Sequence, residues 1–275
     1  MTAGRRFLAA AWLVALSACA PLPPGPSSIR VLVFNIHAGK DAAGASNLEG
    51  VADLVRSTSA DVVLLQEVDR GTKRSGNVDQ LQRLADLVNA DGRADYAPAF
   101  GKSLDYQGGE YGIAALVRGT VTNSRTEPLP VEPPQERSGK SYEPRAALIV
   151  EADTRLGTLQ LLNTHLDASR PEHYRLQESA HILTIVNRME TGRGLMAGGD
   201  FNAEPGSRTY QQLVFGGLQD AWLRCGEGDG FTFPADKPIK RIDYLFLAPG
   251  LRCTSAQVLD TRVSDHRPLL VTVTR

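Results

Sequence analysis

Polar side chains that can bind metal ions or transfer protons follow short apolar runs of this sequence. Four runs end in this way: VLVFNIH on Asn35, VVLLQEV on Glu67, LQLLNTH on Asn163 and His165, and LMAGGDFN on Asp200 and Asn202. Apolar runs of this length, bounded by turn-forming residues, read as buried strands, and folds place much of their chemistry at strand ends. We therefore expect these side chains to line one shared mouth.

Two further segments add acid and imidazole groups to this set. RIDYLF carries Asp243, and VSDHRP places Asp265 and His266 just before the last apolar run. An imidazole beside a carboxylate can take a pKa suited to general acid–base work. Each residue alone also has a plainer interpretation, because Asn and Asp bond to the backbone in turns and a lone Glu is usually a solvated acid.

The residue types of this mouth favour chemistry on phosphate. Carboxylate and amide oxygens, without a cluster of Cys or His, suit a hard cation such as Mg²⁺ or Mn²⁺ better than zinc. Glu67 is the best single candidate ligand. A cation held by one or two carboxylates usually takes a substrate phosphate oxygen as a further ligand. The sequence thus predicts phosphoester hydrolysis, with a water positioned and deprotonated by Asp or His.

The elements that position these residues alternate between strands and amphipathic helices. SNLEGVADLVRSTS and NVDQLQRLADLVNA have helical periodicity, the first with a capping box from Ser46 to Glu49. A further helix is expected after Ser169, with Glu172 completing its cap, and residues 128–144 read as a long Pro-rich loop. Strands outnumber helices and occur in consecutive pairs, which favours an α/β fold with mixed β-sheets packed face to face and helices outside.

Length and charge limit the fold and its partners. The chain has 275 residues, of which 42% are hydrophobic, and this is enough for one large core. Its 30 Lys and Arg residues are balanced by 31 Asp and Glu residues, so the general basic surface of a non-specific nucleic-acid binder is not expected. No linker interrupts residues 29–275, and we expect this range to form one monomeric domain.

The first residues have the pattern of an export signal. Two arginines precede an apolar run at residues 7–16, which is too short to span a membrane comfortably. The sequence LSAC that follows resembles the bacterial lipobox, in which the cysteine, here Cys19, is lipid-modified after cleavage. We expect a signal peptide at 1–18, a Pro-rich tether at 19–28, and a membrane-anchored lipoprotein facing the periplasm or cell exterior. A plain secretory signal is the alternative.

Two cysteines follow Cys19 in the sequence, Cys225 and Cys253. Export to an oxidising compartment would allow them to pair. The sequence does not show whether their Cα atoms come within bonding reach. A disulfide and two buried free thiols are therefore both open.

Seven segments, taken in order, resemble the endonuclease/exonuclease/phosphatase family. They are FNIH, LLQEVD, YGIAAL, NTHLD, GGDFNAEP, RIDYLF and SDHRPL, and together they span about residues 29–275. The specificity lies in their order, since no single segment would identify a family. The resemblance implies a four-layer α/β sandwich, with two mixed β-sheets face to face, helices on the outside and the site at one end.

The resemblance also implies roles in metal binding and water activation. Asn35 and Glu67 would hold the metal, with Asp265 near a second metal position. Asp200 would orient or deprotonate the attacking water. His266 would serve as base or phosphate binder, and which of Asp200 and His266 takes the proton stays open.

A second group of roles concerns the phosphate. Asn202 and His165 would contact the phosphate oxygens, and Asp243 would orient an imidazole. Glu110, just before YGIAAL, is similar to an acid that orients the histidine at position 165. Arg145, in EPRAAL, is similar to a phosphate-contacting arginine of the family.

The substrate stays open at this stage. No basic helix or aromatic wedge for entering a DNA groove is evident, although Arg137 and Lys140 could grip a phosphate-rich ligand. We expect a phosphodiesterase, with a nuclease as the leading subtype. Phospholipid headgroups, inositol phosphates and small phosphoesters are alternative substrates. A catalytically silent lipoprotein that only binds phosphorylated ligands is the alternative from another class.

Overall fold

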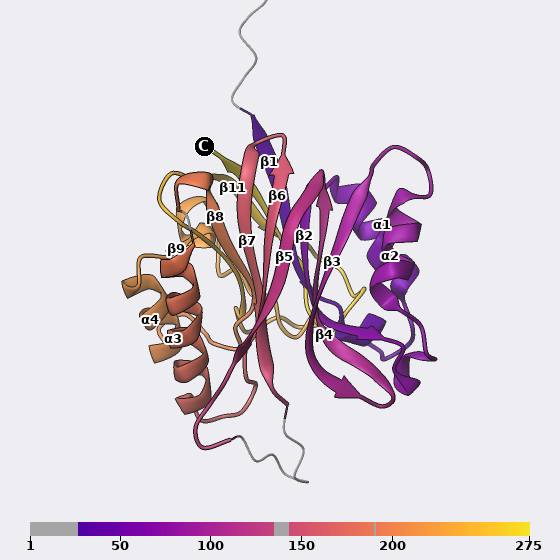
Figure 1. Ribbon diagram of the computed structural model, residues 1–275, viewed down its shortest axis with the longest axis horizontal. Coiled ribbons are helices and arrows are strands. Elements are labelled where there is room, and N and C mark those ends of the chain that lie inside the picture. Colours follow the sequence, from indigo (N-terminus) through magenta and orange to yellow (C-terminus); the bar gives the residue numbers. More distant parts are fainter. Residues whose placement is uncertain (1–26, 135–142, 190) are drawn as a thin grey trace, which may run out of the picture.

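Two six-stranded β-sheets lie face to face between two pairs of helices in the computed structural model, which describes residues 27–134, 143–189 and 191–275 (Figure 1). Helices α1 (Leu48–Thr58) and α2 (Gln80–Asn89) cover the outer face of one sheet. Helices α3 (His173–Arg188) and α4 (Arg208–Phe215) cover the outer face of the other. The predicted four-layer α/β sandwich is confirmed.

The first sheet has the strand order β11-β12-β1-β2-β4-β3. Its strands are β1 (Ser28–Asn35), β2 (Val62–Arg70), β3 (Tyr96–Tyr106), β4 (Gly109–Arg118), β11 (Arg252–Val258) and β12 (Leu269–Thr274). Only β1 and β2 are parallel neighbours, and α1 connects them; the other pairs are antiparallel. The carboxyl ends of β1 and β2 therefore meet at one edge of this sheet.

The second sheet has the order β5-β6-β7-β8-β10-β9. Its strands are β5 (Thr120–Leu129), β6 (Arg145–Thr154), β7 (Gly157–His165), β8 (Leu195–Asp200), β9 (Gln219–Asp220) and β10 (Asp243–Leu247). Here β7 and β8 are the parallel pair, connected by α3, and the other neighbours are antiparallel. Short 3₁₀ turns occupy His37–Gly39, Lys73–Ser75 and Thr191–Arg193.

Alternation along the strands builds the core in three layers. In β1, Val31 and Val33 point into the space between the sheets, whereas Leu32 and Phe34 pack against the helices outside. Successive side chains of a strand point to opposite faces, so a strand buried on both sides must be apolar at nearly every position. This is why the strands that carry the candidate site read as continuous apolar runs.

A disulfide joins α5 (Ala221–Cys225) to β11. It links Cys225 and Cys253, whose Cα atoms are 5.9 Å apart. The pairing that the sequence left open is therefore present, and it fixes the short helix against the edge of the first sheet.

The structure differs from the sequence-based expectation in one strand. Residues 120–127, which were not expected to be a strand, belong to β5, which pairs with β6 along its length. Most of its residues are exposed, because it is an edge strand. Backbone pairing with β6 gives such a strand its structure, and a polar sequence gives little sign of it.

The predicted helix caps are also wrong. Helix α1 has Asn47 rather than Ser46 as its N-cap, and α3 begins after Glu172. Ser169 instead donates its backbone N–H, at 2.9 Å, and its hydroxyl to the carboxylate of Asp167. This local turn forms in place of the predicted cap, because Asp and Ser side chains often bond to neighbouring backbone groups instead of capping a helix.

Several predictions concern residues outside the described part of the chain. They are the signal peptide at 1–18, the lipidated Cys19, most of the tether at 19–28, and the phosphate-gripping Arg137 and Lys140. Within the described residues, no helix combines the length and apolarity needed to cross a membrane.

Candidate functional site

The predicted site residues converge at one end of the sandwich, around a cavity of about 690 Å³. The two parallel strand pairs point their carboxyl ends to this end, so Asn35 and Glu67 arrive from the first sheet and His165 and Asp200 from the second. Seven predicted residues line the cavity: Glu67, Arg145, His165, Asp200, Asn202, Asp265 and His266. The expected shared mouth is thus present.

The cavity is not lined by four of the predicted residues: Asn35, Glu110, Asn163 and Asp243. Asn35 and Asp243 are buried behind residues that do, and they contact those residues directly. Glu110 does not join this group. Its carboxylate pairs with Arg70 at 3.3 Å and with Lys102 at 3.6 Å, on the hairpin of the first sheet.

A bulge in β2 turns Glu67 toward the cavity. The pairing of β2 with β4 shifts register between Leu65 and Val68, and both of these residues pack on the outer face of the sheet. Glu67, within the bulge, has a φ of 57°, in the left-handed region that side-chain-bearing residues rarely adopt. Bulges commonly re-aim a side chain next to a functional site.

The amide of Asn35 connects the two sheets at the base of the site. Its Nδ2 donates to Glu67 Oε1 and to Asp200 Oδ2, each at 3.1 Å. Its Oδ1 accepts from the backbone N–H of His37 at 3.0 Å. The side chain therefore holds the two carboxylates at a fixed separation and is itself fixed by the turn that follows β1.

Asp200 occupies the centre of the site and is 1% exposed. Asp200 Oδ1 accepts the backbone N–H of Asn202 at 2.9 Å, which places Asn202 in the left-handed region with a φ of 48°. Burial, together with the nearby Asp243 carboxylate, raises the pKa of Asp200 to about 7. Near neutral pH this carboxyl group can therefore both accept and release a proton.

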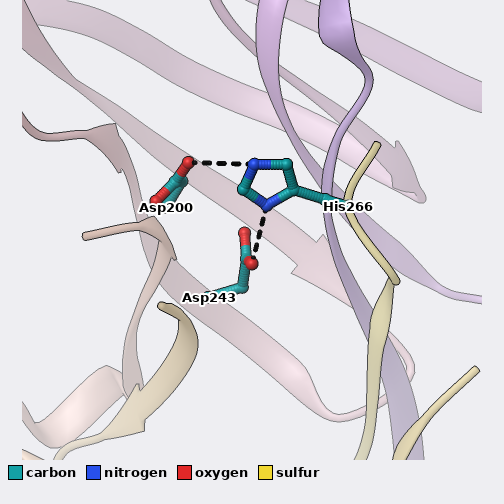
Figure 2. A group of neighbouring side chains, drawn as sticks. All are labelled: Asp200, Asp243 and His266. Atoms are coloured by element: carbon teal, nitrogen blue, oxygen red, sulfur yellow. Dashed lines mark hydrogen bonds and ion pairs between the residues drawn. The ribbon is translucent and has the colours of Figure 1, made fainter. Parts of the chain in front are cut away.

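His266 lies between two carboxylates (Figure 2). Its Nδ1 is 2.9 Å from Asp243 Oδ2, and its Nε2 is 3.7 Å from Asp200 Oδ2. Burial alone lowers the pKa of His266, but Asp243 and then Asp200 outweigh burial and raise the pKa to about 10. The imidazole is accordingly protonated and positively charged at neutral pH.

Two further cationic or imidazole groups border the same space. His165 Nε2 is 3.5 Å from Asp200 Oδ2, on the side of Asp200 opposite β10. Arg145 is buried, with its guanidinium 3.0 Å from Glu143. Burial lowers the pKa of Arg145, but Glu143 and other neighbouring groups reverse this, so the guanidinium stays charged. The cavity therefore combines a central carboxylate with several positive groups.

Two sets of residues could hold a cation. The ligand atoms of Asp200, Asp243 and His266 lie within 4.8 Å of one another, although the 2.9 Å contact inside this triad already uses His266 Nδ1. Glu67 and Asp265 present carboxylate oxygens to the cavity wall. Oxygen donors of this kind fit a hard dication. The donor set around Glu67 therefore fits a metal, with the triad beside it.

One wall of the cavity was missed by the sequence analysis. Arg74, Tyr106 and Tyr111 line it, and the Arg74 guanidinium lies over the Tyr106 and Tyr111 rings at 4.8 Å and 5.2 Å. The buried Asp69 holds Arg74 through two hydrogen bonds of 2.7 Å and 2.8 Å. The only sequence signal was the aromatic content of the β3–β4 hairpin.

Asn163, expected at the mouth, lies between the sheets instead. Its Nδ2 donates to the carbonyl oxygens of Leu65 and Ala114, both at 2.8 Å, and its Oδ1 accepts from Gln66 at 2.7 Å. The physical reason is position along β7: Asn163 and His165 point to the same face of the sheet, but His165 is the last residue of the strand, whereas Asn163, two residues earlier, is still inside the sandwich. Asn163 thus joins the sheets just beneath the site.

Comparisons with known proteins identify the family of the chain. The model of the endonuclease/exonuclease/phosphatase family matches residues 32–266. YbhP of Escherichia coli (strain K12), described as uncharacterized, is 27% identical over 253 residues, covering 88% of this chain and 94% of YbhP.

Solved structures share the fold. A family protein from Leptotrichia buccalis has a TM-score of 0.74 and 21% identity, covering 90% of this chain and 100% of its own. A mannosyl-6-phosphatase from Bacteroides thetaiotaomicron has a TM-score of 0.71 and 19% identity, with the same coverage of 90% and 100%. At such identities these matches establish the fold, and the chemistry must be argued from the site itself.

Proposed function

Since the chain belongs to the endonuclease/exonuclease/phosphatase family, we propose that it is a hydrolase that cleaves phosphoester bonds with the help of a divalent cation. The observation that carries this proposal is that His266 and Asp200 line one cavity with Glu67 and Arg145, while Asp243 contacts His266 from behind the cavity wall. A carboxylate that can accept a proton lies beside a protonated imidazole, and a buried guanidinium and a carboxylate that could hold a cation line the same cavity.

Glu67 is the first candidate for holding the cation, with Asn35 next to it, and Asp265, which also lines the cavity, is the candidate for a second position. The donors are oxygens, which favours Mg²⁺ or Mn²⁺. When bound, such a cation polarises the phosphoryl oxygen and neutralises charge that grows on it. The left-handed backbone of Glu67 supports this role, because strained residues cluster at functional sites.

Asp200 is the better candidate for the base and His266 for the acid. A carboxyl group with a pKa of about 7 is partly ionised at neutral pH, whereas an imidazole with a pKa of about 10 already carries its proton. In the proposed step, a water oxygen bonds to phosphorus, its proton passes to Asp200, and the ester P–O bond breaks. The leaving oxygen then takes a proton from His266. Asp243 fixes the imidazole through Nδ1 and so presents Nε2 to the substrate.

Asn202, His165 and Arg145 are the proposed contacts of the phosphoryl oxygens. Asn202 Nδ2 donates to the carbonyl oxygen of Leu166 at 3.0 Å, so its second amide hydrogen remains for a ligand. Arg145 brings a buried charge, which acts more strongly than an exposed one because water does not screen it. Together these groups suit an anionic transition state.

The proposal is tested with a panel of phosphoesters. Bis-p-nitrophenyl phosphate, p-nitrophenyl phosphate, plasmid DNA and sphingomyelin are incubated with the purified protein in Mg²⁺, Mn²⁺ or EDTA. We expect cation-dependent cleavage of at least one compound, with a diester preferred over the monoester. Replacing the general acid by His266→Ala should lower kcat about 100-fold or more.

A matched control and a binding measurement complete this test. Glu227→Ala removes an exposed acid that does not line the cavity and should leave kcat unchanged. Calorimetric titration with Mn²⁺ should show weaker binding by Glu67→Ala than by the unmodified protein. Activity that survives EDTA and each of Glu67→Ala, Asp200→Ala and His266→Ala would contradict the mechanism. Phosphate binding without any turnover would favour the silent lipoprotein.

We also propose that the protein is exported and anchored through lipid on Cys19. The support is the signal-like sequence that precedes Cys19 and the disulfide of Cys225 and Cys253, which suits an oxidising compartment. In a bacterial host, the full chain should sediment with membranes, and Cys19→Ala should release it or block its processing. A Cys19→Ala protein that is processed and remains membrane-bound would contradict the lipid anchor.

A further inference from the structure

The space at the candidate site extends beyond the proposed catalytic residues. A second hollow, of about 520 Å³, adjoins the first cavity. Both are lined by Ala168, Asn202, Phe233 and His266. Two of these residues are proposed to act on the phosphate, so the reacting phosphorus would lie where the two hollows meet. Such a position leaves room for substrate on both sides of the phosphorus.

Part of the wall of the first hollow is aromatic. Tyr106 and Tyr111 lie on the side of the β3–β4 hairpin, with their ring centroids 6.4 Å apart, and Arg74 covers both rings. Phe233 also lines this hollow, and its ring is tilted by 45° against that of His266, with the ring centroids 4.8 Å apart. Flat aromatic and guanidinium surfaces of this kind accept the face of a planar ring. Because Arg74 already lies over both tyrosine rings, the Arg74 guanidinium and the Phe233 ring are the surfaces that offer an unpaired base a place to stack.

The second hollow is lined by cationic side chains from two loops and a helix. Arg170 and Lys240 are exposed, and neither has an ion-pair partner among the described residues. Arg175 is buried, and its Nη1 donates to the carbonyl oxygens of Asp167 and Ser169. Its Nε has no hydrogen-bond partner in the described part of the chain. A buried donor without a partner is costly unless a ligand completes it.

Acidic residues do not cancel this charge. Glu172 and Glu204 also line the second hollow, against the three cationic residues. Glu172 accepts the hydroxyl of Thr209, at 3.5 Å. Glu204 is exposed at the rim. The hollow therefore keeps an excess of donors and of positive charge, which is the requirement for holding a phosphate rather than a neutral group.

We propose that the second hollow binds a further phosphate group of the substrate, and that the aromatic wall of the first hollow holds a planar base. The substrate class is then an unpaired nucleotide phosphodiester with a second phosphate next to the bond that is cleaved. This inference rests on the proposed function. Two kinds of molecule belong to this class: a single-stranded oligonucleotide and a short nucleotide released from one. Kinetics with substrates of different length distinguish the two.

The test compares dinucleotides that differ by one phosphate. Steady-state kinetics with Mn²⁺ are measured for dithymidine monophosphate and for its 5′- and 3′-phosphorylated forms, and then for a single-stranded decamer. One terminal phosphate should lower KM about fivefold to tenfold, as expected for partly exposed ion pairs. In the double variant Arg170→Gln with Lys240→Gln, this ratio of KM values should fall to about one.

Lys237→Gln is the matched control, since Lys237 is exposed on the same loop as Lys240 but does not line either hollow. It should keep the full preference. Thermal melting of all variants checks that they fold. A preference that persists in the double variant, or an unmodified protein that ignores the terminal phosphate, would overturn the proposal. A further gain with the decamer identifies the longer strand as the better substrate.

A binding measurement separates this inference from the proposed function. Calorimetric titration of the same dinucleotides into Asp200→Asn protein reports affinity without turnover. A phosphate-dependent affinity that the double variant loses supports the subsite, even if the unmodified protein hydrolyses nothing and the proposed function fails. Equal affinity for all three dinucleotides would contradict the subsite, even if the protein cleaves bis-p-nitrophenyl phosphate.

Discussion

Asp200 is the residue on which the candidate site depends most. It is reached by Asn35 from one sheet, by His165 and His266 on either side, and by the backbone of Asn202. A carboxylate shared by so many partners keeps a fixed position, and its burial beside Asp243 sets its unusual proton affinity. Position and proton affinity together make Asp200 suited to activating a water.

The rate of hydrolysis should depend on pH in a bell shape. The proposed base must be ionised, so kcat rises as pH increases through the pKa of Asp200, about 7. The proposed acid must be protonated, so kcat falls as pH increases through the pKa of His266, about 10. A pH profile with plasmid DNA, whose alkoxide leaving group needs a proton, checks both limbs. A kcat that is already maximal at pH 5 would contradict this assignment.

Asp243→Asn should move that profile toward lower pH. Asp243 raises the pKa of His266 and also that of Asp200, so its replacement by a neutral amide lowers both. Burial then acts on His266 without its main opposing charge. We expect a lower maximal kcat, with both limbs at lower pH than in the unmodified protein. An unchanged alkaline limb would show that Asp243 does not hold the proton of His266.

Much of the site was predictable at the residue scale, and its aromatic wall was not. Asp200 and Glu67 follow buried strands, and an acid in that place has few explanations other than a turn or a site. Arg74 and Tyr106 carry no such signal, because they reach the cavity through the approach of the β3–β4 hairpin. That approach is a tertiary property, which the spacing of residues along one strand cannot reveal.

The bulge of β2 shows how an element can be strained in order to aim one side chain. Glu67→Ala and Glu67→Gly both remove the carboxylate and its bond to Asn35. They differ at a φ of 57°, where glycine is relaxed and alanine is not. We expect the glycine variant to be more stable by about 1 kcal/mol, which is a melting difference of about 2–4 °C.

Both Glu67 variants should lose hydrolysis to the same extent, because neither can hold the cation. Thermal denaturation and kcat measured on the same preparations separate backbone strain from chemistry. An alanine variant as stable as the glycine variant would mean that the bulge relaxes when the carboxylate is absent.

Helix α3 carries a buried acid that should make stability depend on pH. Burial raises the pKa of Glu178 from 4.5 to about 7, against the opposing bond from the Asp167 backbone N–H. The folded state therefore binds this proton more tightly than the unfolded state does. Its contribution to the free energy of unfolding is complete below about pH 4.5 and is lost as pH rises through about 7.

Glu178→Gln should remove this dependence, because the amide keeps the acceptor and has no proton to lose. The free energy of unfolding of the variant, measured relative to that of the unmodified protein, should rise by on the order of 2 kcal/mol from pH 5 to pH 8. Urea unfolding at the two pH values measures the difference. The exposed Glu227→Gln serves as control and should gain nothing. An equal gain in both variants would exclude Glu178 as the source.

At the scale of elements, the strands that build the core were predictable from the sequence, and the edge strand β5 was not. Apolar runs such as those of β1 and β8 can be recognised as strands because both of their faces are buried. The edge strand β5 is polar and takes its structure from β6. The predicted N-cap of α3 was wrong for a related reason, since Ser169 forms a hydrogen bond with Asp167 before the helix begins.

At the scale of the whole molecule, the distance between the two sheets determines how far apart the site residues lie. Gly198 lies between them, and an added Cβ would be 2.7 Å from Leu64 and 3.2 Å from Val33, on the opposite sheet. Asn35 and Asp200, which are bonded at 3.1 Å, each lie two residues beyond this contact. A wedge at Gly198 would therefore separate the groups that must cooperate.

Gly198→Ala should cost about 1–3 kcal/mol of stability, as overpacking of a core does. It should also lower kcat, although the substituted residue touches no substrate. Gly192→Ala, which has no atom within 4 Å of its added Cβ, is the control and should change neither. Chemical denaturation and kcat are compared for the three proteins. A stable and fully active Gly198→Ala protein would show that the sheets yield without disturbing the site.

The two ends of the described chain lie at the same end of the sandwich (Figure 1). Ser28 pairs with Thr274 in neighbouring strands, and β1 runs from there to Asn35 at the mouth. A bead or a sensor chip coupled at either end would therefore leave the mouth facing the bulk liquid. Immobilised in this way, the protein would meet even long polymers without obstruction by the solid support.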